Sequence, residues 1–476
     1  MQYSKNQIKS GFIWNALDSF GNQAINLVVN LTLASILGPA SFGLVAMLSI
    51  LIAIANIFVN GGFSSALIRK INRDEKDYST AFYFSVLVSI VVYSIIFFIS
   101  PFISEFYAQP ELTNLTRLIT LTIIINAFAI VPRTKLTVSL NFKNQAKANL
   151  FALIIGGATG VILAYNDFGV WSLVMQQIIS AFISVVSLNI LSPWKPVEPF
   201  CRERFKYLFG FGSKLLASSL LDAIYNNLYG LIIGKQFNAT QLGIFNQANK
   251  ISTLPATLIT TVIQKVTYPM LSNMQDNHEK FDRMYLRILK ISTLIIFPVM
   301  FGLCIVSEPL IDILLGDEWN ASSDLISILT MALALYPIHA VNLNILQVKG
   351  RSDLFLKLEI MKKIIVTIAL IVTVPMGVNA MCVGMVITSY LSLFVNTHYT
   401  GKLSTISQKK QFISLCPIGI ITAISATIGY ILGRDLDTNW LSIMVMLSTA
   451  LFSYVVLIAL FQKTLVNEIK ILLKGV

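Results

Sequence analysis

A stripe of polar side chains runs along the first long apolar segment of the chain. Within residues 13–37, polar residues recur every three or four positions, which places them within an arc of about 120° on one helix face. An apolar helix of this length can span a bilayer, and it tolerates a polar face only where that face borders protein or water. The segment therefore predicts one wall of a polar cavity inside a membrane. The stripe consists of Asn15, Asp18, Asn22, Asn26 and Asn30.

Two further segments carry polar stripes. Residues 211–234 and 243–270 each place polar side chains along one face, and Pro255 interrupts the second segment. Asn, Ser and Thr also form hydrogen bonds between packed membrane helices, so any one of these residues alone could serve helix packing instead of a cavity. The coincidence of several stripes favours a cavity. The residues are Lys214, Ser218, Asp222, Tyr225, Asn226 and Tyr229 in the first segment, and Asn246, Asn249, Lys250, Thr253, Thr257, Thr260, Thr261 and Gln264 in the second.

Ionisable residues within the apolar segments indicate the chemistry of this cavity. A charge at the bilayer centre costs about 2.5–3.5 kcal/mol, so it is usually paired or hydrated. The cationic excess suits a phosphate or an acidic sugar, and an Asp18–Lys250 ion pair is a compatible alternative. Of the three histidines, His339 is the one kept as a cavity candidate, because Asn342 and Asn344 lie beside it. The predicted cavity residues are Asp18, Asn22, Asn26, Asn30, Asn60, Arg133, Asp222, Asn226, Lys250, Gln264 and Lys265.

The composition is that of an integral membrane protein. Of 476 residues, 55% are hydrophobic and only 12% are charged, against about 25% in a typical soluble domain. The net charge of +12 does not indicate nucleic acid, because its distribution follows the membrane-spanning segments. The four cysteines are far apart, and the sequence has no phosphate-binding loop, zinc motif or nucleophile elbow. The sequence therefore predicts a protein that is not an enzyme and has no cofactor or bound metal.

Fourteen segments are long and apolar enough to be predicted as membrane-spanning helices. If the N-terminus is cytoplasmic, the cytoplasmic segments hold 30 of the 35 Lys and Arg residues and the external loops hold three. This positive-inside pattern predicts that both termini are cytoplasmic. The predicted spans are 12–37, 42–67, 79–101, 116–138, 149–166, 170–192, 211–234, 243–270, 289–314, 323–346, 360–378, 380–399, 413–432 and 440–461.

An internal repeat divides these spans into two halves. The stretch from Pro101 resembles the stretch from Pro309, and the stretch from Leu33 aligns with that from Leu231, so that Gly43 pairs with Gly243. The offsets are 208 and 200 residues, and six spans separate the copies, so the halves have parallel topology as in transporters that rock two lobes. The predicted fold is all-α, with two pseudo-symmetric six-helix lobes and two C-terminal helices. The predicted domains are 1–205, 206–402 and 403–476.

The N-terminal residues resemble a known family. The opening KSGFIWNALDSFGNQAINLVVNLTLASILGPASFGLVAMLSI, with GGFSSALIRK at 61–70, is similar to Wzx-type polysaccharide exporters of the multidrug/oligosaccharidyl-lipid/polysaccharide (MOP) superfamily. The turn from Gly38 to Gly43 is the most recognisable part. The resemblance implies two lobes with alternating access to a central cavity. It also implies, as cargo, an oligosaccharide linked to undecaprenyl pyrophosphate. The lipid II flippase branch is less similar in sequence, because the first two spans carry no Arg before Arg69.

This resemblance predicts a flippase for a lipid-linked glycan repeat unit in the bacterial inner membrane, serving O-antigen, capsule or exopolysaccharide synthesis. Its predicted partners are the lipid-linked oligosaccharide and the bilayer. A coupling ion, H⁺ or Na⁺, and a polysaccharide polymerase complex are left open. Two alternatives also stand: a cation-coupled small-molecule exporter of the same superfamily, and a non-transporting membrane partner of a glycan-assembly complex.

Overall fold

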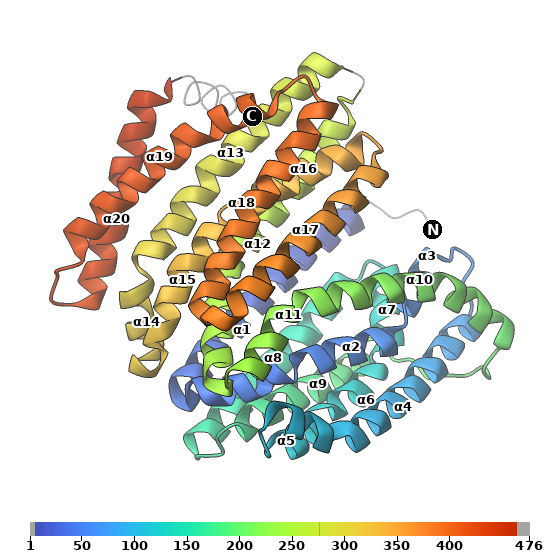
Figure 1. Ribbon diagram of the computed structural model, residues 1–476. Helices are drawn as coiled ribbons and strands as arrows, with labels where there is room; N and C mark the ends of the chain where they lie inside the picture. Colours follow the sequence, from blue (N-terminus) through green and yellow to red (C-terminus); the bar gives the residue numbers. More distant parts are fainter. Residues whose placement is uncertain (1–4, 276, 464–476) are drawn as a thin grey trace. The chain divides into compact units, whose positions relative to one another are not determined.

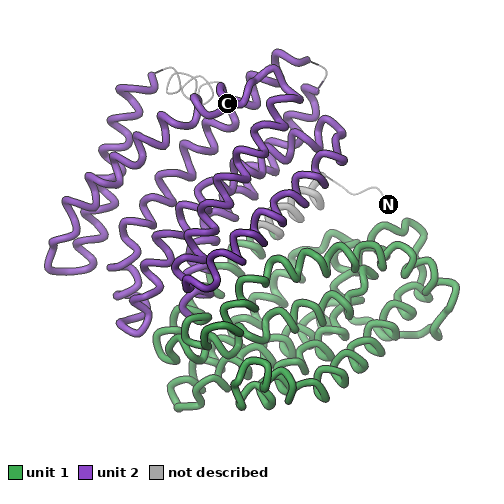
Figure 2. The backbone as a smooth tube through the Cα atoms, in the orientation of Figure 1, with its two compact units in different colours: residues 1–243 green, residues 244–476 purple. Residues whose placement is uncertain are grey.

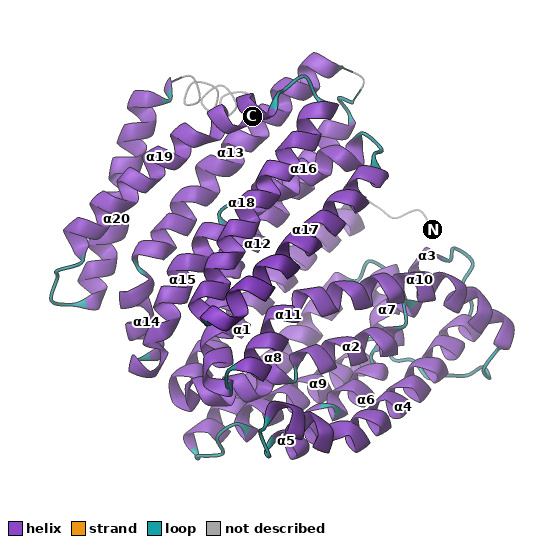
Figure 3. Ribbon diagram, viewed as in Figure 1, coloured by secondary structure: helices purple, strands orange, loops and turns teal. Residues whose placement is uncertain are grey.

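The described part of the chain is built from helices. The computed structural model describes residues 5–275 and 277–463, and within these ranges helices alternate with short turns and loops (Figure 3). This confirms the predicted all-α class. The helices up to residue 272 are α1 (Lys5–Met47), α2 (Ser49–Asn60), α3 (Phe63–Arg69), α4 (Glu75–Tyr107), α5 (Leu112–Ile119), α6 (Leu121–Ala127), α7 (Ile130–Val138), α8 (Phe142–Tyr165), α9 (Trp171–Leu191), α10 (Arg202–Asn226), α11 (Leu228–Gln236) and α12 (Ala239–Ser272) (Figure 1).

The remaining described helices follow residue 277. Two of them are single 3₁₀ turns, η1 and η2, which stand at the ends of longer helices. These helices are α13 (His278–Ile305), α14 (Ser307–Leu315), η1 (Asp317–Trp319), α15 (Asn320–Leu333), α16 (Tyr336–Val348), α17 (Ser352–Thr373), η2 (Val374–Met376), α18 (Val378–Leu403), α19 (Gln408–Gly433) and α20 (Asn439–Phe461).

The chain divides into two compact units, unit 1 (residues 1–243) and unit 2 (residues 244–476), which Figure 2 colours separately. Helix α10 packs on α2, α3 and α4 within unit 1. The division therefore falls within α12, whereas the sequence repeat suggests lobes of residues 1–205 and 206–402. The lobe boundaries stay a prediction.

The multi-pass membrane character of the fold is confirmed, but the count of fourteen spans is not. In the described residues, ten helices are long and apolar enough to cross a membrane, or eleven if the pair 112–127 and 130–138, bent by 44°, is one span. The predicted spans 211–234, 243–270 and 360–378 coincide with α10–α11, α12 and α17, which are not among them. In the first two, the polar stripes lower the mean hydropathy.

Helix α8 packs closely against both α1 and α9. An alanine Cβ at Gly157 would lie 2.6 Å from Val29 Cγ2 on α1, and one at Gly156 would lie 2.8 Å from Ser180 Cβ on α9. The Ser180 hydroxyl donates a hydrogen bond of 3.0 Å to the carbonyl oxygen of Ala152. Small residues allow such close approach between membrane helices, and dispersion contacts then hold them together. This packing fixes the rotation of α1 and so the direction of its polar face.

Two glycines that the repeat pairs with each other make reciprocal backbone contacts. Helix α1 bends at Gly38, whose φ of +67° favours glycine, and then crosses the first turn of α12. A Cβ at Gly43 would lie 1.7 Å from the carbonyl oxygen of Ala239, and a Cβ at Gly243 would lie 1.9 Å from that of Pro39. The repeat offset of 200 also pairs Pro39 with Ala239. Each glycine therefore approaches the residue four positions before the other glycine.

Candidate functional site

A polar cluster centred on Asp18 lies where the stripe of α1 meets α8. The carboxylate of Asp18 accepts a hydrogen bond of 2.7 Å from the amide of Asn22, one helical turn away. It also accepts from the Asn149 amide on α8, at 3.3 Å to each carboxylate oxygen. Charge-assisted hydrogen bonds of this kind compensate for removing a carboxylate from water. The cluster therefore explains how an aspartate is held within an apolar helix.

Basic side chains accompany this cluster. Arg133 on α7 lies close enough to Asp18 to be influenced by the charge of its carboxylate. Lys143, in the first turn of α8, places its ammonium 5.6 Å from the ring centroid of Trp14 on α1. The structure thus brings together three predicted cavity residues, Asp18, Asn22 and Arg133. It adds Asn149, which the sequence reasoning missed.

Several buried oxygen atoms near the stripe have no hydrogen-bond partner among the described residues. They are the side-chain carbonyl oxygens of Asn22, Asn30 and Gln145. Native proteins rarely leave such atoms unsatisfied, and ordered water or ligand groups commonly complete them. Gln145 lies one turn before Asn149 on α8. These acceptors suit hydroxyl groups, whether from water or from a sugar.

The other predicted residues of unit 1 lie apart from this cluster along their helices. Asn26 on α1 and Asn60 at the end of α2 are exposed. Asp222 and Asn226 are exposed on α10. Gly212 of the same helix packs against the Gly61–Gly62 turn. A Cβ at Gly212 would lie only 2.3 Å from the Gly61 carbonyl oxygen. This close contact fixes the rotation of α10 against the turn.

Within unit 2, the remaining predicted residues lie on α12. Lys250, Gln264 and Lys265 are all exposed, and the Thr253 hydroxyl donates to Asn249 Oδ1 at 3.3 Å. The polar stripe of α12 is therefore exposed only in part, since Thr260 on the same stripe is buried.

His339 does not lie on an exposed face but belongs to a packed polar network inside unit 2. Its Nδ1 is 3.1 Å from the Asn396 amide, and its Nε2 is 3.2 Å from the Ser389 hydroxyl, both on α18. Nearby, the buried Tyr285 hydroxyl lies 2.5 Å from Asn342 Oδ1 and 2.8 Å from Gln411 Oε1. These contacts join α13, α16, α18 and α19, so the network ties helices together. This favours the packing interpretation of His339.

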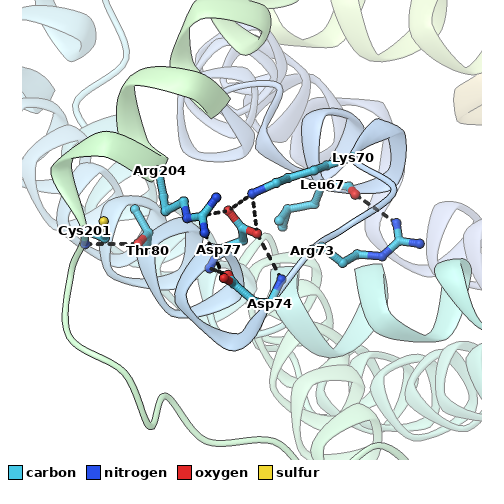
Figure 4. A network of polar contacts seen from close by, with 8 residues as sticks. All are labelled: Leu67, Lys70, Arg73, Asp74, Asp77, Thr80, Cys201 and Arg204. Carbon is cyan, nitrogen blue, oxygen red and sulfur yellow. Dashed lines mark hydrogen bonds and ion pairs between the residues drawn. The ribbon is translucent and has the colours of Figure 1, made fainter.

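A charged cluster ties α10 to the turn between α3 and α4 (Figure 4). The buried carboxylate of Asp77 lies 2.6 Å from the Lys70 ammonium and 3.8 Å from Arg204 Nε, while Arg204 also pairs with Asp74 at 3.0 Å. Burial by itself raises the pKa of Asp74. The hydrogen bond from the Asp77 backbone N–H and the charges of Arg204 and Lys70 outweigh burial, so that pKa lies below its ordinary value. Lys70 and Arg204 compensate for the charge of the buried Asp77 carboxylate, which indicates a structural role for this cluster.

Several known proteins are similar to this chain. The chain is 24% identical over 355 residues to the teichuronic acid biosynthesis protein TuaB of Bacillus subtilis (strain 168), covering 73% of this chain and 72% of that protein. It is 23% identical over 399 residues to the lipopolysaccharide biosynthesis protein WzxC of Escherichia coli (strain K12), covering 82% and 79%. Among solved structures, the lipid II flippase MurJ in an inward closed conformation matches with a TM-score of 0.78 at 16% identity, covering 96% of this chain and 100% of that one. The chain therefore shares the MurJ fold.

The family itself is defined by a match that spans more than half of the chain. The model of the family described as "Polysaccharide biosynthesis protein" matches residues 32–324, a range that includes the Gly38–Gly43 turn. This confirms the resemblance found in the sequence. The chain belongs to the polysaccharide biosynthesis protein family.

Proposed function

We propose that this protein is a flippase that moves a polyprenyl-pyrophosphate-linked oligosaccharide repeat unit across the bacterial inner membrane by alternating access. The proposal requires no covalent chemistry. The observation that carries it is the Asp18 cluster: a carboxylate, amides and a nearby arginine lie within helices that are long and apolar enough to cross a membrane, or within a bent pair of such helices. Relatives named for teichuronic acid and lipopolysaccharide biosynthesis, together with the fold of a lipid II flippase, support the cargo class.

In this proposal the polar residues contact sugar hydroxyls or water, and the basic residues attract the pyrophosphate or acidic sugars. The unsatisfied oxygens of Asn22, Asn30 and Gln145 support the first role, because each can accept a hydroxyl proton. The basic residues are Arg133, Lys250 and Lys265. The polar residues are Asp18, Asn22, Asn26, Asn30, Asn60, Asp222, Asn226 and Gln264.

In this proposal, transport is driven by a coupling ion, and both termini lie in the cytoplasm. Asp18 is the favoured carrier of a coupling H⁺ or Na⁺, because its carboxylate contacts two helices and its charge state changes what Asn149 and Arg133 face. The Lys and Arg distribution supports cytoplasmic termini in the inner membrane.

The test combines gene deletion with point variants. Deletion is expected to leave a polyprenyl-linked repeat unit accumulating on the cytoplasmic side, measured by mass analysis of lipid-linked intermediates. Arg133→Ala and Lys265→Ala are expected to lower export about tenfold, as for one lost charge-assisted hydrogen bond, at unchanged protein level. Lys195→Ala, an exposed lysine between α9 and α10, serves as the control.

Two results would contradict this proposal. Normal export by the Arg133 and Lys265 variants would remove these residues from the site. Uptake of amphiphilic cations by the reconstituted protein, with no accumulated intermediate in the deletion strain, would instead support the small-molecule exporter.

A further inference from the structure

A cleft distinct from the Asp18 cluster lies within unit 2, where α13, α14 and α15 approach α19 and α20. It consists of a wider cavity of about 840 Å³ and a narrower one of about 500 Å³. The two cavities share Ile305, Glu308, Ser323, Asp324 and Tyr430 in their walls, so they adjoin one another.

The wider cavity lies at the ends of membrane-spanning helices. Helix α13 ends at Ile305, α19 ends at Gly433 and α20 begins at Asn439, and all three are long and apolar enough to cross a membrane. Charged residues at such ends lie at the level of the lipid headgroups. Glu308 and Arg434, in the wall of the wider cavity, are therefore placed where a headgroup can reach them.

The wider cavity offers groups of both signs. Glu308 and Asp324 are exposed carboxylates in its wall, whereas Asp312 is engaged by the Asn439 amide. The Arg434 guanidinium uses Nε to pair with Asp435 at 3.2 Å, and arginine has four further N–H donors. Across the described residues, no three His, Cys, Asp or Glu side chains are grouped so as to hold a metal ion. An ammonium group is a cation that the Glu308 and Asp324 carboxylates can bind through charge-assisted hydrogen bonds.

The narrower cavity has more apolar than polar surface, although hydroxyl groups and the carboxylates of Glu308 and Asp324 also line it. Phe301 of α13 and Met331 of α15 face a stretch of α19 in which Ala423 and Ala426 are small. Its volume and lining suit the first carbons of an acyl chain below a headgroup. A ligand for the whole cleft therefore needs an ammonium, an anionic group that Arg434 can bind, and an apolar tail.

We infer that this cleft binds a phospholipid with an ethanolamine headgroup. The ammonium donates hydrogen bonds to Glu308 and Asp324, the phosphate accepts from Arg434, and an acyl chain enters the narrower cavity. A choline headgroup fits less well because its quaternary nitrogen has no N–H donor. A glycerol headgroup leaves the lipid with a net negative charge facing two carboxylates. The inference does not depend on the transported cargo.

The test is lipid binding by the full-length protein in detergent, measured by native mass spectrometry. Phosphatidylethanolamine, phosphatidylcholine and phosphatidylglycerol with identical acyl chains are compared. Wild type is expected to retain the ethanolamine lipid about tenfold better than the choline lipid, the effect of one charge-assisted hydrogen bond. Equal retention of these two lipids would overturn the inference.

Variants locate the bound lipid. Glu308→Gln with Asp324→Asn is expected to abolish the preference for ethanolamine. The control is Asp317→Asn with Glu318→Gln, in the adjacent 3₁₀ turn and outside the cleft lining, which is expected to keep it. A preference that survives in the Glu308/Asp324 variant would overturn the inference.

Arg434→Gln tests the phosphate contact. It is expected to weaken retention of the ethanolamine lipid while leaving dodecylamine, an amphiphilic cation without phosphate, unaffected. Dodecylamine bound as tightly as the lipid by wild type would identify a site for simple amphiphilic cations and overturn the inference. Thermal unfolding of each variant verifies that the exposed substitutions leave the fold intact.

Discussion

At the residue scale, Asp18 is informative because its partners come from two helices. Asn22 lies one turn along α1, and Asn149 lies on α8, 131 residues away in the sequence. The Oδ1 atom of Asp18 accepts from both amides, and its Oδ2 accepts from Asn149 as well. An asparagine at this position loses the charge and places an NH₂ group beside the NH₂ group of Asn149. A carboxylate is therefore favoured at position 18 because both neighbouring side chains present amide donors to it.

We expect Asp18→Asn to lower the free energy of unfolding by about 1 kcal/mol, because it removes the charge that strengthens the hydrogen bonds from Asn22 and Asn149. The exchange variant Asp18→Asn with Asn149→Asp restores one carboxylate between the helices and is expected to recover most of the loss. Unfolding in detergent measures both. Asn26→Ala, at an exposed position on the same stripe, is the control, with an expected change within about 0.5 kcal/mol. A double variant no more stable than Asp18→Asn would contradict the pairing.

At the element scale, the helices of unit 1 are positioned by close backbone approaches rather than by long side chains. Gly43 and Gly243 let α1 cross the first turn of α12, and Gly212 lets α10 cross the Gly61–Gly62 turn. At each crossing the contacted atom is a backbone atom, so no side chain can rotate away to make room. The crossings therefore fix where the polar faces of α1 and α10 point.

Gly43→Ala is expected to destabilise the protein by about 1–3 kcal/mol, since the new methyl group would overlap the carbonyl oxygen of Ala239. Gly210→Ala is the matched control. It lies within α10, where a Cβ meets nothing within 4 Å, and alanine favours a helix over glycine. We expect the control to be neutral or slightly stabilising. Equal melting temperatures for the two variants in detergent would show that the crossing is not a tight contact.

At the scale of the whole molecule, the distribution of Lys and Arg determines the expected orientation. Thirty of the 35 basic residues fall in the segments predicted to be cytoplasmic. The loop after α4 and the loop between α19 and α20 fall on the opposite side by this prediction. The wider cavity of the cleft in unit 2 is lined by Arg434, which follows α19, so by this prediction it also faces that side.

Single cysteines in a background without Cys201, Cys304, Cys382 and Cys416 test this orientation. We expect a membrane-impermeant maleimide to label Gln109→Cys and Asp437→Cys in intact spheroplasts. Lys76→Cys and Lys409→Cys are expected to react only after permeabilisation. The reverse labelling pattern would invert the topology, and labelling of all four in intact spheroplasts would show leaky membranes and require repetition.

The sequence alone determined the class of protein, the family and the approximate location of most helices. These features depend on local composition and periodicity, since an apolar run of about 20 residues needs no distant partner to be a membrane helix. The same locality explains why the stripe of α1 could be predicted. Gln145 and Asn149 share one face of α8 at a spacing of four, a signal that was available but lay next to a segment predicted to be cytoplasmic.

The tertiary structure decided what those local patterns face. Packing between helices places Asn149 against Asp18. Packing also places His339 within a network across four helices, whereas Lys265 is exposed. Packing also sets the breaks in the helices, such as the 44° bend between residues 127 and 130. Such features depend on contacts between residues far apart in the chain, and periodicity carries no record of those contacts. For that reason the sequence could predict a polar wall, while the partners of its residues had to come from the fold.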